Sequence, residues 1–136
     1  MMESTQTVER SRLLALLAGL MDFATGAGLC VAPALTLSLM QVAVPSQEAL
    51  AYVRFVGVFV GAVGFSYLGG WWGKSATHLR AVFRFTIPFR LGAGTFCAVA
   101  VVVGEWSPMW LSVTVADGGL MALQIWLLRG DWGTQS

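Results

Sequence analysis

Residues 49–68 read ALAYVRFVGVFVGAVGFSYL, an apolar stretch that contains a single charged residue, Arg54. A helix rises about 1.5 Å per residue and the hydrocarbon core of a bilayer is about 30 Å thick, so about 20 such residues cross it. Three further windows of this kind occupy residues 13–32, 82–103 and 108–128. The sequence therefore predicts an all-α integral membrane four-helix bundle, with residues 1–136 forming a single transmembrane domain.

Composition supports the membrane class and excludes several others. Of the 136 residues, 57% are hydrophobic and 11% are charged, whereas about a quarter are charged in an average soluble domain. The formal net charge is +1, and no Lys/Arg cluster lies on a polar element, so nucleic acid is not a predicted partner. His78 is the only histidine, and Cys30 and Cys97 form no CxxC pair, so no metal centre is predicted.

A short apolar segment, residues 34–40, follows the first window. Pro33 disfavours helical geometry in the residue before it, so this segment is predicted to be a kinked continuation of the first helix or a short interfacial helix. Pro45 then marks a turn, and Ser46 is the expected N-cap of the second membrane helix.

The loop charges predict the orientation in the membrane. With four spans, both termini share one face with the loop between the second and third spans, and the basic residues of that face are Arg10, Arg12, Lys74, Arg80 and Arg129. The loops of the opposite face hold Glu48 and Glu105 and no Lys or Arg. The positive-inside rule therefore predicts cytoplasmic N and C termini, in a bacterial inner membrane. Lys74, Arg80 and Arg84 are predicted to contact anionic lipid phosphates.

Four charged residues lie deep inside the apolar windows, namely Asp22, Arg54, Arg90 and Asp117, whereas Arg84 lies just inside the third window. Small residues at helical spacing flank each of them, which predicts that all four side chains point into the bundle. A charge at the centre of a span costs about 2.5–3.5 kcal/mol, so pairing is the cheaper state. We expect Asp117 to pair with Arg90, and Asp22 to pair with Arg54 or to join the same intramembrane polar cluster.

Two interpretations of this cluster remain open at the level of sequence. The charges either hold the helices in register without any chemistry, or they form a polar site for a proton, an ion or a quinone-like headgroup. Mutual satisfaction of all four groups, without an adjoining cavity, would exclude the second interpretation.

Glycines follow Arg54 at helical spacing, at Gly57, Gly61 and Gly64. Such spacing allows two helix backbones to approach closely, and we expect packing within the monomer rather than dimerisation. Tyr67, near the end of the same window, is expected to be an anchor at the membrane interface.

The order of these features resembles the small four-helix membrane proteins of the DoxX-like kind. The likeness rests on a first helix ending at Ala32 and Pro33, on Pro45, on Arg54 with the three glycines, and on a last helix carrying Asp117. DoxX proteins are associated with quinone-linked oxidation of sulfur compounds, so the resemblance implies the fold and, more distantly, quinone chemistry. Only Arg54 is carried over as a matching site residue, and the chain has no cysteine pair to supply a redox centre.

No Ser-His-Asp arrangement, HExxH motif, P-loop or dinucleotide fingerprint is present, so no catalytic residue is assigned and enzymatic activity is not predicted. The first functional prediction is a structural or accessory subunit of a larger membrane complex of the respiratory or photosynthetic type. Such a subunit would contact membrane lipids and other integral membrane subunits, and would share any lipid, quinone or pigment with them. The alternative is a small membrane carrier, or a quinone-linked DoxX-like protein, that uses the Asp/Arg cluster as its site.

Overall fold

The computed structural model describes residues 2–132, with side chains from Ser4 onward. The described residues form the helices α1 (Met2–Val31), α2 (Pro33–Leu39), α3 (Gln47–Trp72), α4 (Ala76–Val102) and α5 (Leu111–Arg129), and the 3-10 turn η1 (Pro108–Trp110). Four segments are long and apolar enough to cross a membrane: Ser4–Val31, Gln47–Trp72, Ala76–Val102 and Pro108–Arg129. The prediction of an all-α chain with four such helices is confirmed.

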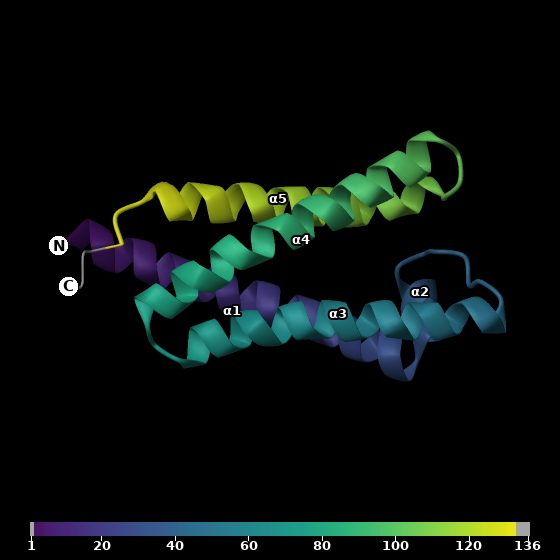
Figure 1. Cartoon of the computed structure of the whole chain (residues 1–136), viewed down its shortest axis with the longest axis horizontal. Helices are drawn as coiled ribbons and strands as arrows, with labels where there is room; N and C mark the ends of the chain where they lie inside the picture. Colours follow the sequence, from purple (N-terminus) through teal and green to yellow (C-terminus); the bar gives the residue numbers. More distant parts are fainter. Residues whose placement is uncertain (1, 133–136) are drawn as a thin grey trace.

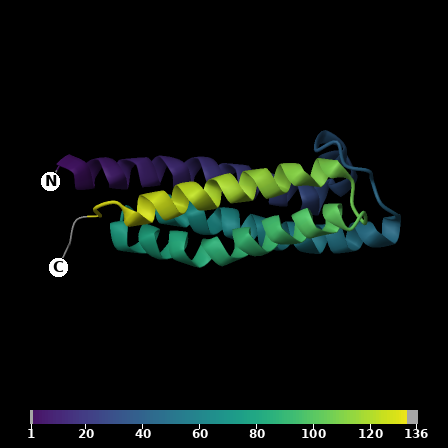
Figure 2. The same cartoon turned by 90° about the horizontal axis from the view of Figure 1, so that it is seen from above.

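The four long helices run up and down along one axis (Figures 1 and 2). The start of α1, the turn between α3 and α4, and the end of α5 lie at one end of the bundle, which we call the terminal end. The connections from α1 to α3 and from α4 to α5 lie at the opposite end. Ser46 caps α3 through its side chain, which accepts a hydrogen bond from the Ala49 amide at 3.4 Å, as the sequence predicted.

The α1–α3 seam is the closest helix contact in the molecule, and glycines make it. A Cβ atom added at Gly64 would lie 2.3 Å from the backbone nitrogen of Phe23, and one added at Gly26 would lie 2.3 Å from that of Gly61. Gly57 also faces α1, where an added Cβ would lie 2.9 Å from the carbonyl oxygen of Gly26. Only hydrogen fits at these positions, so the two backbones touch directly.

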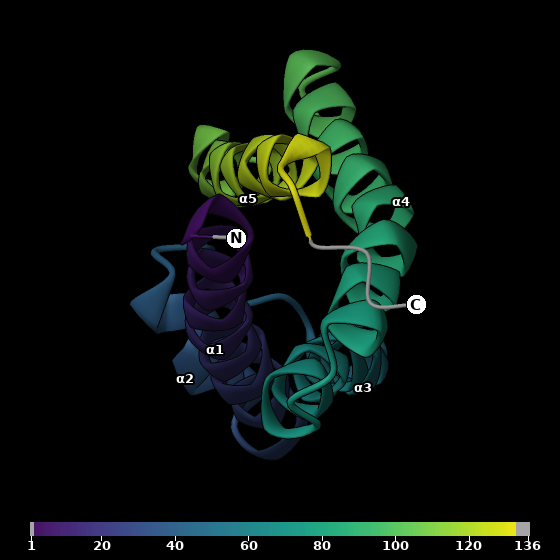
Figure 3. The ribbon, with the colours of Figure 1, turned by 90° about the vertical axis from the view of Figure 1, so that its left-hand side faces the viewer.

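Helices α4 and α5 form a second pair. The Thr114 hydroxyl of α5 donates a hydrogen bond of 2.9 Å to the Gly94 carbonyl of α4, and Gly94 leaves room for Asp117 opposite it. In Figure 1, α5 and much of α4 lie above α1 and α3, and the end-on view of Figure 3 shows the same separation.

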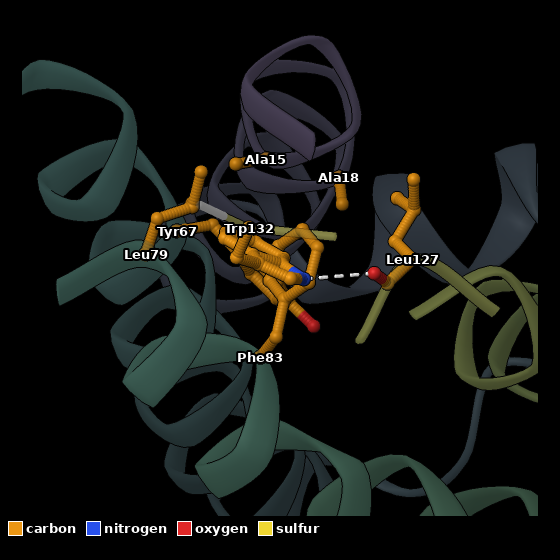
Figure 4. Close-up of a cluster of buried hydrophobic side chains, with 7 residues drawn as sticks. All are labelled: Ala15, Ala18, Tyr67, Leu79, Phe83, Leu127 and Trp132. Atoms are coloured by element: carbon orange, nitrogen blue, oxygen red, sulfur yellow. Dashed lines mark hydrogen bonds between the residues drawn. The ribbon is translucent and has the colours of Figure 1, made fainter. Parts of the chain in front are cut away.

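A cluster of buried apolar side chains joins the two pairs near the terminal end (Figure 4). It consists of Ala15, Ala18, Tyr67, Leu79, Phe83, Leu127 and Trp132. The indole N–H of Trp132 donates 2.8 Å to the Leu127 carbonyl, which holds the chain after α5 against the bundle. This is the main apolar core, and it lies next to the polar residues described below.

The segment after the first span forms a separate short helix, α2. Ala32 leaves the helical region, at φ −135° and ψ 64°, and Pro33 starts a separate helix of 7 residues. This helix folds back on α1, because a Cβ added at Gly28 would lie 2.7 Å from the Thr36 hydroxyl oxygen. Leu37 of α2 is buried with Leu29, Val42 and Leu50 in a second, smaller core. Helix α1 also begins at Met2, well before the predicted start of its span at Leu13.

Candidate functional site

The candidate site is a polar cluster inside the bundle, and Arg90 of α4 is its centre. One terminal nitrogen of the guanidinium lies 2.7 Å from a carboxylate oxygen of Asp22 on α1, and the other lies 2.6 Å from Asp117 on α5. The Arg90 side chain is 3% exposed, and those of Asp22 and Asp117 are 11% and 15% exposed. One arginine therefore links the first, fourth and fifth helices by charge-assisted hydrogen bonds.

Tyr67 brings α3 into the same cluster. The Arg90 Nε–H donates 3.0 Å to the Tyr67 hydroxyl, and the hydroxyl is 2.8 Å from the Thr86 hydroxyl. Thr86 in turn donates 2.8 Å to the Val82 carbonyl. The Gln124 amide of α5 donates to both hydroxyls, at 2.9 Å to Thr86. The polar cluster, defined as Asp22, Tyr67, Thr86, Arg90, Asp117 and Gln124, thus draws on all four long helices.

Small residues create the space for these side chains. Gly64 sets the backbone of α3 against residues 22 and 23 of α1, which fixes the level of Asp22 on the α1–α3 seam. Gly94, one turn after Arg90, faces Asp117, and a Cβ added there would lie 3.6 Å from the Asp117 Cβ. Because the carboxylates rest on closely packed backbone, their positions are set by the helix seams as well as by their own hydrogen bonds.

Arg54 does not belong to the polar cluster, and its inclusion there is corrected. Its side chain is exposed, and within residues 4–132 it forms no ion pair. The register of the α1–α3 seam explains this, because the Cys30 thiol lies 3.5 Å from the Arg54 carbonyl while Asp22 lies level with Gly64. Arg54 is separated from Tyr67 by about 20 Å along α3, too far to reach Asp22.

The separation of Arg54 changes the charge of the site. Two carboxylates share one guanidinium, so the polar cluster has a formal charge of −1 when both aspartates are ionised. In addition, the Oε1 atom of Gln124 is buried and has no hydrogen-bond partner among the described residues. Cys97 of α4 is also buried. The described chain brings together no three His, Cys, Asp or Glu side chains that could hold a metal ion.

Sequence reasoning missed three members of the cluster as site residues. Tyr67 was expected at the membrane interface but is fully buried, at 0% exposure. Its position three residues after Gly64 continues the glycine stripe that faces α1, and this spacing was the available signal. Thr86 and Gln124 lie one or two helical turns from Arg90 and Asp117 on the same faces, so helical spacing also pointed to them.

Comparison with known proteins gives no match: no protein-family model, no curated protein and no solved structure is similar to this chain. The resemblance to the DoxX-like proteins stays a prediction from the sequence. The site is therefore interpreted from its own geometry and charge.

The three residues predicted to contact lipid phosphates lie near the terminal end. Lys74, in the turn between α3 and α4, and Arg84 are exposed. Arg80 is half-buried, and its guanidinium lies over the Trp132 ring at 5.9 Å from the centroid. Arg80 therefore packs on the end of the apolar core, whereas Lys74 and Arg84 stay open to the surroundings.

Proposed function

We propose that this protein is a small membrane carrier that binds one unit of positive charge, a proton or a small cation, at the polar cluster. The observation that carries the proposal is the sharing of Arg90 by Asp22 and Asp117, which leaves one negative charge without a countercharge. Ionisable groups inside membrane spans commonly mark ion or proton paths.

The depth of the cluster makes this excess charge costly. Asp117 lies about 18 Å along α5 from Arg129, and Asp22 lies about 15 Å along α1 from Arg12, so both are near the middle of their spans. An uncompensated charge at that depth costs about 2.5–3.5 kcal/mol. Uptake of a proton or a cation removes this cost, so the site favours a positively charged occupant.

The hydrogen-bonding character of the cluster points the same way. Its groups without a described partner are acceptors: the buried Gln124 Oε1 and the carboxylate oxygens that Arg90 does not contact. A proton or a small cation complements acceptors. A quinone offers only carbonyl acceptors, and the arginine that would donate to them is already enclosed, so a quinone is the poorer match.

Infrared difference spectroscopy of the protein in liposomes tests this proposal, because a protonated carboxyl absorbs apart from a carboxylate. We expect one protonated carboxyl near neutral pH. Either Asp22→Asn or Asp117→Asn removes the excess charge, so each single variant abolishes that band, whereas Arg54→Gln, outside the cluster, keeps it. A band that persists in either aspartate variant contradicts the shared-charge site.

Two further measurements separate the possible occupants and the carrier activity. Loss of the carboxyl band on adding Na⁺ or K⁺ identifies a cation that competes with the proton. Dye-monitored proton or cation uptake into the liposomes tests transport, and we expect it to vanish in both aspartate variants and to persist in Arg54→Gln. Absence of uptake by the wild-type protein contradicts the carrier.

A separate observation favours the second candidate, an accessory subunit of a larger membrane complex. Gly92 of α4 and Gly118 and Gly119 of α5 have no atom within 4 Å of an added Cβ, so small residues face outward. In membranes, such faces suit close packing with another helix. Native purification tests this candidate: we expect partner chains to co-elute with the wild-type protein and to be lost in Gly119→Leu.

The orientation is part of the proposal. Arg10, Arg12, Lys74, Arg80 and Arg129 are the basic residues at the terminal end, and the positive-inside rule places that end in the cytoplasm of a bacterial cell. A fluorescent protein that folds only in the cytoplasm, fused to the C-terminus, should fluoresce. The DoxX-like relationship is likewise proposed, at the level of the fold.

A further inference from the structure

A second site lies at the terminal end of the bundle, away from the polar cluster. There the first turns of α1 and the end of α5 line a half-open cavity of about 310 Å³. Its walls are Gln6, Thr7, Arg10, Trp126, Leu127, Arg129, Gly130 and Asp131. Ligand sites in proteins commonly enclose about 300–1,000 Å³, so this cavity suits a headgroup rather than a whole lipid.

The cavity lies at the level where the apolar spans of α1 and α5 meet the polar surroundings. Arg10 lies one turn before Leu13, where the apolar part of α1 begins, and Arg129 is the last residue of α5. Trp126 is 58% exposed, and tryptophan at such a level is typical of the headgroup region. The cavity therefore opens where phosphates of lipid headgroups would lie.

The two arginines that line the cavity keep their hydrogen-bond donors available. The Arg10 guanidinium lies over the Trp126 ring, 6.0 Å from its centroid. A guanidinium beside an aromatic ring can still donate its N–H groups to phosphate oxygens. Within residues 4–132, neither Arg10 nor Arg129 forms an ion pair. By contrast, Arg12 at the same end donates to the Trp71 carbonyl at 3.1 Å.

The lining of the cavity favours an anion, because two of its side chains, Arg10 and Arg129, are cationic. The phosphodiester of a lipid headgroup is the anion found at this level of a membrane. We propose that this cavity binds the phosphodiester headgroup of an anionic phospholipid, with Arg10 and Arg129 as the two phosphate ligands and Trp126 as the aromatic wall.

Binding of phosphatidylglycerol to the purified, delipidated protein tests the proposal, measured by native mass spectrometry over a lipid titration. Each basic residue near a membrane surface contributes about 1 kcal/mol, so the double variant Arg10→Gln/Arg129→Gln should bind about 30-fold more weakly. Trp126→Leu should also weaken binding, because Arg10 loses its support. Arg54→Gln is the control, an exposed arginine that lies far from this pocket and does not line it, and it should bind as the wild-type protein does.

Two comparisons decide the source and the class of the ligand. Soluble glycerophosphoglycerol, which has the same headgroup without acyl chains, should not compete at matched concentration, and full competition would indicate a free-phosphate site instead. Phosphatidylethanolamine, whose headgroup carries a compensating positive charge, should bind more weakly. Equal affinity for both lipids, or wild-type affinity in a double variant that remains monodisperse with an unchanged melting temperature, overturns the proposal.

Discussion

The α1–α3 seam and the polar cluster join helices in opposite ways. At the seam, glycines stand in place of larger residues, so the backbones of α1 and α3 come into contact along several turns. The cluster instead joins the two helix pairs through a few long polar side chains, with Arg90 contacting Asp22, Asp117 and Tyr67.

This difference has a physical consequence for how each contact fails. Dispersion forces at the seam are spread over many atoms, so the seam is sensitive to added volume. The cluster concentrates its energy in a few charge-assisted hydrogen bonds, so it is sensitive to the loss of a single group. The following substitutions test this distinction.

The largest effect is expected for Arg90→Leu, which leaves the buried Asp22 and Asp117 without the arginine that both contact. Removing one partner of a buried ion pair costs about 3–5 kcal/mol. The free energy of unfolding, measured by SDS titration in mixed micelles, should fall by this amount. Arg54→Leu is the matched control, an arginine inside a span but outside the cluster, and should change stability little. Equal losses in the two variants would show that Arg90 has no special role.

A smaller but clear loss is expected for Gly64→Ala in the α1–α3 seam. The new Cβ would lie 2.3 Å from the Phe23 backbone nitrogen, and backbone cannot move aside as a side chain can. Overpacking of this kind costs about 1–3 kcal/mol. Gly69→Ala on the same helix meets nothing within 4 Å and should be neutral or slightly stabilising. Thermal unfolding followed by circular dichroism gives the stability of both variants. A Gly64→Ala protein as stable as the wild type would contradict the close backbone contact between α1 and α3.

The smallest effect is expected for Thr114→Val, which removes the hydrogen bond from α5 to the Gly94 carbonyl while keeping the side-chain shape. Hydrogen bonds between membrane helices average about 0.6 kcal/mol. Ser66→Ala is the control, because the Ser66 hydroxyl bonds to the Ala62 carbonyl within one helix. The same SDS titration should show a loss for Thr114→Val alone, and a loss above about 1.7 kcal/mol would exceed the range for such bonds.

The helices were predictable from the sequence because apolar length is a local property. Each of the four apolar windows corresponds to a long helix, and the N-cap at Ser46 lies where its side-chain chemistry placed it. The start of α1 was not predictable in this way, since its first residues are polar and extend a helix that an apolar window cannot detect.

The candidate site was predictable only in part, because it depends on the register between helices. Counting residues places Asp22 and Asp117 about 15–18 Å from their helix ends and Arg90 about 9 Å past Arg84, within reach of an arginine side chain. These three residues do meet. Arg54 has a comparable depth but approaches from the opposite end of the bundle, next to Cys30 rather than Asp22. The glycine contacts that set this register act between segments distant in sequence, and residue counting within one helix does not reveal them.

The placement of Asp22 on the first helix has a consequence for synthesis. Arg90 follows Asp22 by 68 residues, and Asp117 follows Arg90 by another 27. A growing chain therefore delivers an acid to the membrane long before its arginine exists, while the glycine contacts between α1 and α3 can already form. The ion pairs of Arg90 are therefore among the last contacts that the growing chain can form, after the glycine contacts of the first helix pair.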